Sequence, residues 1–337
     1  MNLFAAIPVE EPSQISQARR VATSWAFRLD FNETRTGQAA LIATELATNL
    51  AKHARRGEML FSAVDDGSGH GANGIDIIAL DHGPGIPDIA LSRRDGFSTS
   101  GTLGHGLGAI ERLADTFDLF TMASGTVILA RLCRDMQRPR PPKSPIQLAS
   151  VLVSKPGEDT VGDGWSWRLR DERLAILVAD GLGHGLFAHE AAQQAIDLFG
   201  REHEESPQRI IQDVHAALRS TRGAAVATLV ADLERGVVRY CGIGNIASHI
   251  LTSKNTRQSL VSQNGTAGHT AARIQEFTYP LEPGWTLVMH SDGVSSSWDL
   301  APYPGLRNRH PSLIAGIIYR DFSRRRDDVG IVVARQR

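Results

Sequence analysis

A proline-rich segment near the middle of the chain constrains the fold more than any other feature of the sequence. Residues 137–145 read QRPRPPKSP. Closely spaced prolines fix φ and remove backbone donors, so neither a helix nor a sheet strand continues through them. The length of 337 residues also suggests two domains, at about 150 residues for each. The sequence therefore predicts domains at residues 1–135 and 147–337, joined by a linker at 136–146.

Composition is that of an ordinary globular protein and excludes several classes of function. Hydrophobic residues make up 42% of the chain and charged residues 22%, so extended disorder is not expected. The formal net charge of -1 gives no footprint for nucleic acid, and the short basic run 324–326 is expected to be a solvated helix end. Cys133 and Cys241 lie far apart without metal-ligand spacing, and we find neither a signal peptide nor a membrane-spanning run. The sequence predicts a cytoplasmic protein that binds neither nucleic acid nor membrane.

Hydrophobic periodicity predicts an α/β (α+β) chain. Before the linker, a helix is expected from Ser13, its cap, to Leu29, because apolar residues recur there at helical spacing. Further helices are predicted at 36–55 and 107–117, and strands at 59–63, 75–81, around 119 and at 127–132. After the linker, strands are predicted at 151–153, 174–179, 225–230, 237–243, 286–289 and 331–334, and helices at 187–201, 208–219 and 312–322.

Polar residues in the N-terminal part indicate a ligand site. Glu45, Asn49 and His53 are spaced four residues apart and therefore share one face of the predicted helix. On its own such a stripe is more typical of a solvated face. Asp81 ends an apolar strand in the sequence DHGPG, whose glycines allow a tight turn and leave the carboxylate available to a ligand amine. The glycine-rich run 101–108 leads into a helix, a layout whose bare amides suit phosphate oxygens.

In this order these segments resemble the GHKL ATPases, and residues 83–115 resemble the RsbT-type serine/threonine kinases of bacterial partner switching. The resemblance implies a Bergerat-type α/β sandwich that binds ATP with Mg²⁺. It assigns Asn49 to the Mg²⁺ ion and Glu45, as the catalytic residue, to the attacking hydroxyl. Asp81 would read the adenine. The other nucleotide-binding positions that it implies are Lys52, Gly83, Gly85, Thr102, Gly104, Gly106 and Gly108.

Aspartates at predicted strand ends mark a second site after the linker. Asp180 and Asp292 each end an apolar run and precede a glycine, Asp163 lies between two glycines, and Asp327-Asp328 precede the last strand. A single Asp-Gly pair is ordinarily a β-turn. Several converging carboxylates without matching basic residues repel one another unless divalent cations lie between them. Two such ions about 4 Å apart would activate water for in-line attack on a phosphoryl group.

Six motifs follow one another after the linker, in the order GDGW, DGLGHG, RGAAVATL, GIGNI, NG and SDG. Through these motifs this part of the chain resembles the SpoIIE-like branch of the type 2C (PPM) metal-dependent protein phosphatases, and most of all the RsbX type. The resemblance implies an α-β-β-α sandwich that holds two Mn²⁺ or Mg²⁺ ions. Asp180 and Asp292 would be the catalytic metal ligands, and Asp163 would hold metal-bound water. Alignment on the last strand favours Asp327 as a further ligand, with Asp328 as the alternative. The implied metal-binding residues are Asp163, Asp180, Gly181, Asp292 and Asp327.

Together the two resemblances imply a bifunctional regulator of partner switching. The first module would phosphorylate, and the second dephosphorylate, serine or threonine in STAS-domain proteins that act on a sigma factor or a stressosome-like complex. In the alternative, the N-terminal domain is a non-catalytic nucleotide sensor or anti-sigma-like binding module attached to a phosphatase. The sequence leaves open whether the chain forms a homodimer.

Overall fold

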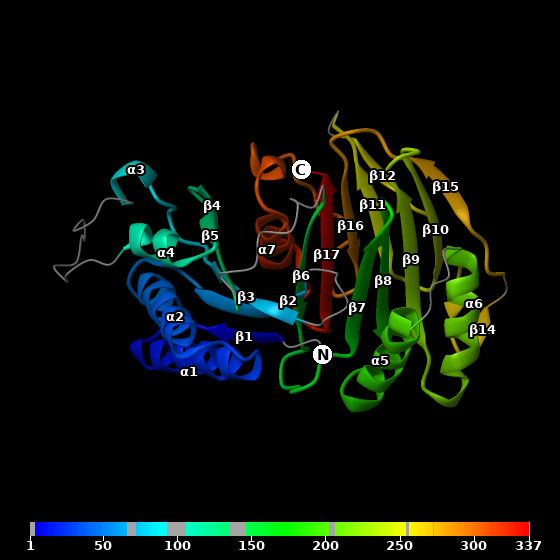
Figure 1. Cartoon of the computed structure of the whole chain (residues 1–337), viewed down its shortest axis with the longest axis horizontal. Coiled ribbons are helices and arrows are strands. Elements are labelled where there is room, and N and C mark those ends of the chain that lie inside the picture. The colour runs from blue at the N-terminus through cyan, green and yellow to red at the C-terminus, as the bar shows by residue number, and fades with distance from the viewer. Residues whose placement is uncertain are drawn as a thin grey trace.

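The structure, a computed structural model, describes residues 4–65, 72–92, 106–134, 146–201, 206–253, 256–271 and 273–336. Most of the predicted linker lies outside these residues, and strand β6 begins at Ile146, one residue inside it. The chain before and after this point forms separate sheets (Figure 1). None of the helices in the described ranges is long and apolar enough to cross a membrane.

An antiparallel sheet with the strand order β1-β2-β3-β5-β4 forms the centre of the N-terminal part. Its strands are β1 (Phe4–Pro8), β2 (Glu58–Asp65), β3 (Ala72–Leu80), β4 (Thr116–Met122) and β5 (Gly125–Cys133). Helices α1 (Pro12–Arg28), α2 (Glu33–His53) and α4 (Leu107–Leu113) cover one face of the sheet and share one hydrophobic core with it. The short α3 (Ile89–Ser92) follows the loop after β3.

Three predicted helix boundaries in this part are wrong. Glu11, not Ser13, caps α1: it forms a capping box with Gln14, and Pro12 takes the first helical turn, where its missing N–H costs nothing. The helix predicted at 107–117 ends at Leu113, because the following residues pair with β5 as strand β4. The helix predicted at 36–55 begins at Glu33, where the Asn32 side chain caps it.

Two antiparallel sheets stack face to face in the C-terminal part, with strand orders β15-β10-β9-β8-β7 and β12-β11-β16-β17-β6. Their inner faces bury a common core that includes Val178, Leu229 and Leu287. The strands are β6 (Ile146–Val153), β7 (Asp163–Arg170), β8 (Arg173–Gly181), β9 (Ala224–Asp232), β10 (Val237–Ile243), β11 (Ala247–Leu251), β12 (Arg257–Ser259), β15 (Phe277–Pro280), β16 (Thr286–His290) and β17 (Val329–Gln336). A small hairpin-like sheet joins β13 (Gly265–Thr266) to β14 (Thr270–Ala271).

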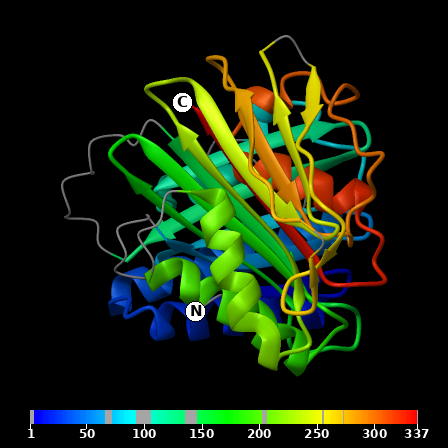
Figure 2. The same ribbon diagram turned by 90° about the vertical axis from the view of Figure 1, so that its right-hand side faces the viewer.

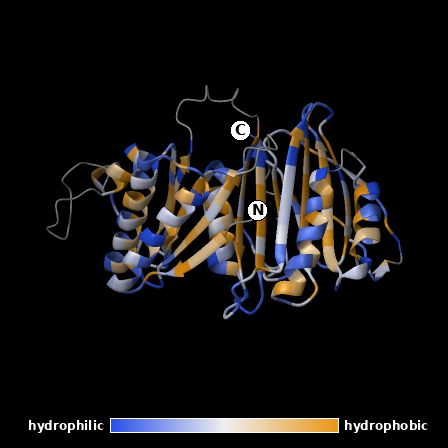
Figure 3. Cartoon of the chain, turned by 60° about the horizontal axis from the view of Figure 1, so that its bottom comes forward, coloured by the Kyte–Doolittle hydropathy of each residue, from blue (hydrophilic) through white to orange (hydrophobic). Residues whose placement is uncertain are grey.

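Helices cover both outer faces of this sandwich. α5 (Leu186–Arg201) and α6 (Pro207–Ala217) cross the sheet that contains β8 and β9 (Figure 2). α7 (Pro311–Phe322) covers the sheet that contains β16 and β17, and short 3₁₀ helices span Leu218–Ser220 and Leu306–Asn308. Figure 3 shows apolar colour along the strands and mixed colour on the helices. The predicted α-β-β-α sandwich and the mixed α/β class are confirmed.

Helix α7 also packs against the N-terminal part. Ten of its twelve residues are buried, which fits its apolar character on every side. The face of the N-terminal sheet that α1 and α2 leave free lies against α7 (Figure 1), and both contribute to one hydrophobic core. A Cβ on Gly316 of α7 would lie 3.1 Å from side-chain atoms of Leu80 and of Val127, so a glycine here permits the close approach. The two parts of the chain therefore share a core across α7.

Polar contacts fix the same interface. The buried carboxylate of Asp76 in β3 binds Arg131 of the same sheet at 2.6 and 2.8 Å and accepts a hydrogen bond from Ser312 Oγ of α7 at 3.0 Å. Burial by itself would raise the pKa of Asp76, but the Arg131 guanidinium lowers it below its ordinary value. On the same helix, the Tyr319 hydroxyl donates to Glu58 Oε1 of β2 at 2.7 Å. These bonds join α7 to two strands of the N-terminal sheet.

Candidate functional site

Two adjacent strands of the sandwich present the first pair of predicted metal ligands. Asp163 at the start of β7 and Asp180 near the end of β8 are register partners in the antiparallel ladder. A Cβ on Gly181 would overlap the carbonyl oxygen of Ala188, so only glycine lets α5 cross this strand end. The DGLGHG motif therefore places Asp180 next to the point where β8 meets α5.

The second Asp-Gly turn approaches the same place from the other sheet. Asp292 follows β16, and a Cβ on Gly293 would overlap the main-chain oxygen of Asp328, which precedes β17. The glycine thus brings the turn after β16 against the segment that carries Asp327. Asn245 Nδ2 donates to Asp292 Oδ2 at 2.7 Å and fixes that carboxylate.

A cavity of about 430 Å³ gathers three of the predicted ligands, Asp180, Asp292 and Asp327. The other residues that line it are Leu182, Gly183, Ala225, Gly244, Asn245, Asn264, Gly265 and Thr266. They come from β9, from the small strand β13 and from the loops that follow β8 and β10 or precede β13. The structure therefore brings together the aspartates that the sequence spreads over almost 150 residues, since 327 minus 180 is 147.

Asp163 is buried behind this cavity. Its Oδ2 atom accepts a hydrogen bond from Ser291 Oγ at 2.5 Å, and Ser291 Oγ accepts one from the Gly330 N–H at 2.9 Å. Its Oδ1 atom is buried and has no hydrogen-bond partner within the described chain. A buried carboxylate oxygen without a partner is costly unless a cation or an ordered water satisfies it.

The electrostatics of these carboxylates point to a missing positive charge. Burial, followed by repulsion from Asp292 and Asp327, raises the pKa of Asp180 from its ordinary value of 3.8 to about 7. Burial and then the neighbouring Asp180 raise the pKa of Asp163 well above its ordinary value. The pKa of Asp292 is raised by burial and then by Asp327. Carboxylates that repel one another in this way are stabilised by a hard divalent cation.

The geometry suits cations that keep part of their water shell. Within the described residues, no three acidic, histidine or cysteine side chains converge closely enough to cage one ion by themselves. The aspartates instead border a cavity with room for water, and Mg²⁺ in particular retains several water ligands in proteins. The all-oxygen donor set and the unsatisfied Asp163 oxygen therefore fit Mg²⁺ or Mn²⁺.

The structure separates the roles of Asp327 and Asp328. Asp328 is buried, and its two carboxylate oxygens accept hydrogen bonds from the N–H groups of Lys155 and Gly162, at 2.8 and 2.9 Å. Its carboxylate therefore holds the loop between β6 and β7. Asp327 is exposed and borders the cavity, so it remains the predicted ligand.

The predicted nucleotide site lies between α2 and the loop after β3. Glu45 and Asn49 are half-buried on α2, whereas Lys52 is exposed. Asp81 Oδ1 accepts a hydrogen bond from the Gly83 N–H at 2.5 Å, and burial raises the pKa of Asp81 above its ordinary value. Gly85 has φ +77°, and a Cβ there would overlap the carbonyl of Met122.

Part of the glycine box can also be placed. Gly106 precedes the first residue of α4, and Gly108 is buried within that helix. Thr102 and Gly104 lie outside the described residues, and their roles stay predictions.

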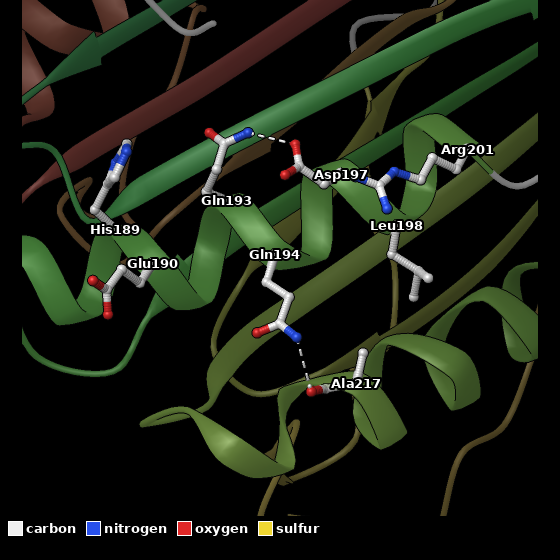
Figure 4. A pocket seen from close by; sticks show the side chains of 8 residues that line it. All are labelled: His189, Glu190, Gln193, Gln194, Asp197, Leu198, Arg201 and Ala217. Carbon is white, nitrogen blue, oxygen red and sulfur yellow. Dashed lines mark hydrogen bonds between the residues drawn. The ribbon is translucent and has the colours of Figure 1, made fainter.

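A second hollow, of about 400 Å³, lies between α5 and the end of α6 (Figure 4). None of the predicted metal-binding aspartates lines it. Gln193 donates to Asp197 at 2.7 Å and Gln194 donates to the Ala217 carbonyl at 3.1 Å, so these lining groups satisfy one another. The candidate active site is therefore the cavity of the aspartates.

Comparison with known proteins matches a different family to each of the two parts of the chain. The family model described as histidine kinase-like ATPase domain matches residues 9–132, and the model of stage II sporulation protein E (SpoIIE) matches residues 170–337. Serine/threonine-protein kinase RsbT of Bacillus subtilis (strain 168) is 38% identical over 131 residues, which cover 39% of this chain and 96% of RsbT. The chain joins an RsbT-family domain to a SpoIIE-family phosphatase domain.

Further relatives concern the SpoIIE-family domain and its fold. Phosphoserine phosphatase RsbX of Bacillus subtilis (strain 168) is 26% identical over 150 residues, 44% of this chain and 75% of RsbX. A solved structure of RsbX in complex with magnesium has a TM-score of 0.50 at 23% identity and covers 57% of this chain and 96% of its own. A structure from work on the bacterial stressosome has a TM-score of 0.52 at 28% identity, and the match covers 56% of this chain and 99% of that structure's chain. The RsbX structure shares the fold of the part of this chain that it covers.

Some residues of the site had no signal of their own in the sequence. Ser291 was visible only as part of the SDG motif, and its bonds to Asp163 and Gly330 depend on the packing of β7 against β17. Thr266 reaches the cavity through the small β13 strand, which no periodicity predicted.

Proposed function

We propose that this chain opposes two activities on one class of substrate, serine or threonine residues of STAS-domain proteins. The SpoIIE-family domain would remove the phosphate, and the RsbT-family domain would add it from ATP. The observation that carries the proposal is the cavity that gathers Asp180, Asp292 and Asp327 in front of the buried Asp163. The named activities of RsbT and RsbX support the direction of each step.

In the phosphatase step the chain supplies ligands and fixed orientations. Asp180, Asp292, Asp327 and the carbonyl of Gly181 would hold two divalent cations. When bound, such cations neutralise the phosphate dianion and lower the pKa of water to near neutrality. Asn245 keeps the Asp292 carboxylate in place, and Asp163, held through Oδ2 by Ser291, keeps Oδ1 as an acceptor for water.

In the kinase step positioning and charge are the main requirements. Glu45 would accept the proton of the attacking hydroxyl, and Asn49, one helical turn later on the same face of α2, would bind Mg²⁺. Asp81 would accept a hydrogen bond from the adenine amine, because the Asx turn to Gly83 fixes its carboxylate at the end of the strand.

A phosphate-release assay and a metal-binding measurement test the phosphatase half of the proposal. Purified chain with Mn²⁺ is expected to release phosphate from a serine-phosphorylated STAS-domain protein, and excess chelator is expected to stop the release. Activity that persists in chelator would exclude the metal-dependent mechanism. The Asp163→Asn variant is expected to bind Mn²⁺ more weakly in calorimetry, which measures the site without turnover.

A second candidate function for the RsbT-family domain is nucleotide sensing without transfer. Two contacts favour it. Arg320 of α7 donates a hydrogen bond to the main-chain oxygen of Asp81, and two residues beyond the end of the helix the Arg324 N–H donates to the Gly293 carbonyl at 2.8 Å. A nucleotide at Asp81 would thus act on the two segments that carry Asp292 and Asp327, which this second bond joins. The Glu45→Gln variant discriminates the two functions. If the domain is a kinase, the variant loses transfer of phosphate from ATP. If the domain is a sensor, the variant keeps any effect of ATP on phosphate release by the other domain.

A further inference from the structure

Exposed apolar side chains gather at one edge of the metal cavity. The described residues include six large apolar side chains that are strongly exposed, and three of these lie within six residues of one another, Leu182, Leu186 and Phe187. Their exposed fractions are 54%, 60% and 56%. Leu182 also lines the cavity of the aspartates, and the other two residues open α5. Single exposed apolar residues are ordinary, but a contiguous group beside an active site indicates a contact surface.

A fixed positive charge lies against this group. The Arg222 guanidinium carbon is 4.8 Å from the centre of the Phe187 ring, a cation–π distance. Its Nη1 atom lies 3.3 Å from the position that a Cβ on Gly183 would occupy, and Gly183 lines the cavity. Among the residues that the structure describes, no carboxylate forms an ion pair with Arg222.

The backbone holds Arg222 in this position. The Leu182 N–H donates to the Gly223 carbonyl at 2.9 Å, which joins the loop of the DGLGHG motif to the loop before β9. His269 Nε2 donates to the Arg222 carbonyl at 2.9 Å. The apolar group and the arginine are therefore parts of one surface, although they come from different loops.

We infer that Leu182, Leu186, Phe187 and Arg222 form a docking lip for the phosphorylated segment of the protein substrate. The inference rests on the proposed phosphatase function and adds how the substrate is recognised. Phosphoserine carries a charge of about -1.5 to -2 at neutral pH, which complements an arginine at the rim of the cavity. An apolar residue beside the phosphoserine would cover Leu186 and Phe187. The lip is continuous with the catalytic cavity, and this continuity favours a substrate segment over any other occupant.

The test compares a protein substrate with a small one. Phe187→Ser and Leu186→Ser are measured with a serine-phosphorylated STAS-domain protein and with p-nitrophenyl phosphate, both with Mn²⁺. We expect kcat/KM for the phosphoprotein to fall about 10-fold or more further than kcat/KM for the small ester, mainly through KM. In the Asp180→Asn background, which captures substrate without turnover, Phe187→Ser is expected to raise the Kd of the phosphoprotein by a similar factor. Arg222→Leu is expected to raise KM for both substrates.

Phe27→Ser is the matched control, because Phe27 is 80% exposed on α1, within the RsbT-family domain. It is expected to change neither kcat/KM value. Equal losses on the two substrates in Phe187→Ser and Leu186→Ser, or an unchanged Kd in Phe187→Ser, would overturn the docking lip while leaving the phosphatase in place. A wild-type protein inactive on both substrates would overturn the proposed function instead. Conversion of a dimer to a monomer by Phe187→Ser, seen in sedimentation, would assign the surface to self-association and likewise overturn the inference.

Discussion

Arg320 Nη1 donates a hydrogen bond of 2.9 Å to the main-chain oxygen of Asp81, although Arg320 belongs to α7 of the SpoIIE-family domain and Asp81 follows β3 of the RsbT-family domain. The Arg320 side chain is only 3% exposed and is paired with Asp321 at 2.7 Å. Gly125 makes the approach feasible, because a Cβ there would overlap the Asp81 carbonyl. The strand end of the predicted nucleotide site is therefore fixed by a residue of the phosphatase domain.

Replacing Arg320 by alanine is expected to lower the free energy of unfolding by about 2–4 kcal/mol, because Asp321 loses its cation and the Asp81 carbonyl its donor. Denaturant unfolding measures the loss, and fluorescent-nucleotide binding is expected to weaken in parallel. Arg325→Ala is the control: Arg325 is 52% exposed in its pair with Glu58, and it should cost less than about 1 kcal/mol. Equal effects of the two variants would contradict a structural role for the buried arginine.

Gly316 of α7 tests the core that the two domains share. Alanine in a helix interior is ordinarily favoured over glycine by about 1 kcal/mol, and Gly37 of α2, with open space around it, is expected to show this gain as Gly37→Ala. Gly316→Ala is expected to be neutral or destabilising, because its Cβ meets Leu80 and Val127 at 3.1 Å. Hydrogen exchange is expected to rise in β3 as well as in α7. A gain in stability equal to that of Gly37→Ala would contradict the tight packing.

The acidic cluster predicts an unusual pH dependence for the metal-free protein. Burial raises the pKa of Asp180 from 3.8 to about 7, so between these values the folded state binds more protons than the unfolded state. Its free energy of unfolding is therefore expected to fall as the pH rises from about 4 to about 7, by a few kcal/mol. Denaturant titrations in chelator measure this fall, and Asp180→Asn should flatten it. Added Mn²⁺ is expected to restore stability above pH 7, because a ligand that binds only the folded state stabilises it. A flat profile without metal would contradict the mutual repulsion of the carboxylates.

Asp292→Asn is expected to reduce phosphate release by at least about 100-fold, because the amide can neither neutralise a cation nor be fixed by Asn245 in the same way. The matched control is Asp197→Asn, in the hollow between α5 and α6, which should retain activity. Steady-state hydrolysis of p-nitrophenyl phosphate with Mn²⁺ is the measurement. A similar loss in both variants would place the active site elsewhere.

The sequence was most informative where local chemistry determines structure. Asp180 and Asp292 follow apolar runs and precede glycines, so their positions at the ends of strands were predictable. Strand β7 was not predicted, because DGWSWRLR mixes apolar and charged residues and has intermediate burial along most of its length. The short β1 was also missed, since its pairing with β2 depends on residues at least 50 positions away.

Long-range contacts account for the remaining differences. Whether Asp327 or Asp328 faces the cavity depends on the amides of Lys155 and Gly162, which lie 173 and 166 residues before Asp328. The sequence predicted a helix at 312–322, but nothing in its pattern revealed that one side of α7 would meet another domain. The roles of Thr102 and Gly104 remain predictions.

The most direct test of two opposed activities in one chain follows labelled phosphate from the γ-position of ATP onto a STAS-domain protein. With Asp180→Ala, label is expected to accumulate on the partner, because transfer continues while removal is blocked. With the wild-type chain and Mn²⁺ the same label should appear only transiently and end as inorganic phosphate, and with Glu45→Gln in the Asp180→Ala background it should not appear. Absence of label from the partner with Asp180→Ala, while the wild-type chain still dephosphorylates that protein, would contradict the kinase and leave a phosphatase joined to a nucleotide sensor.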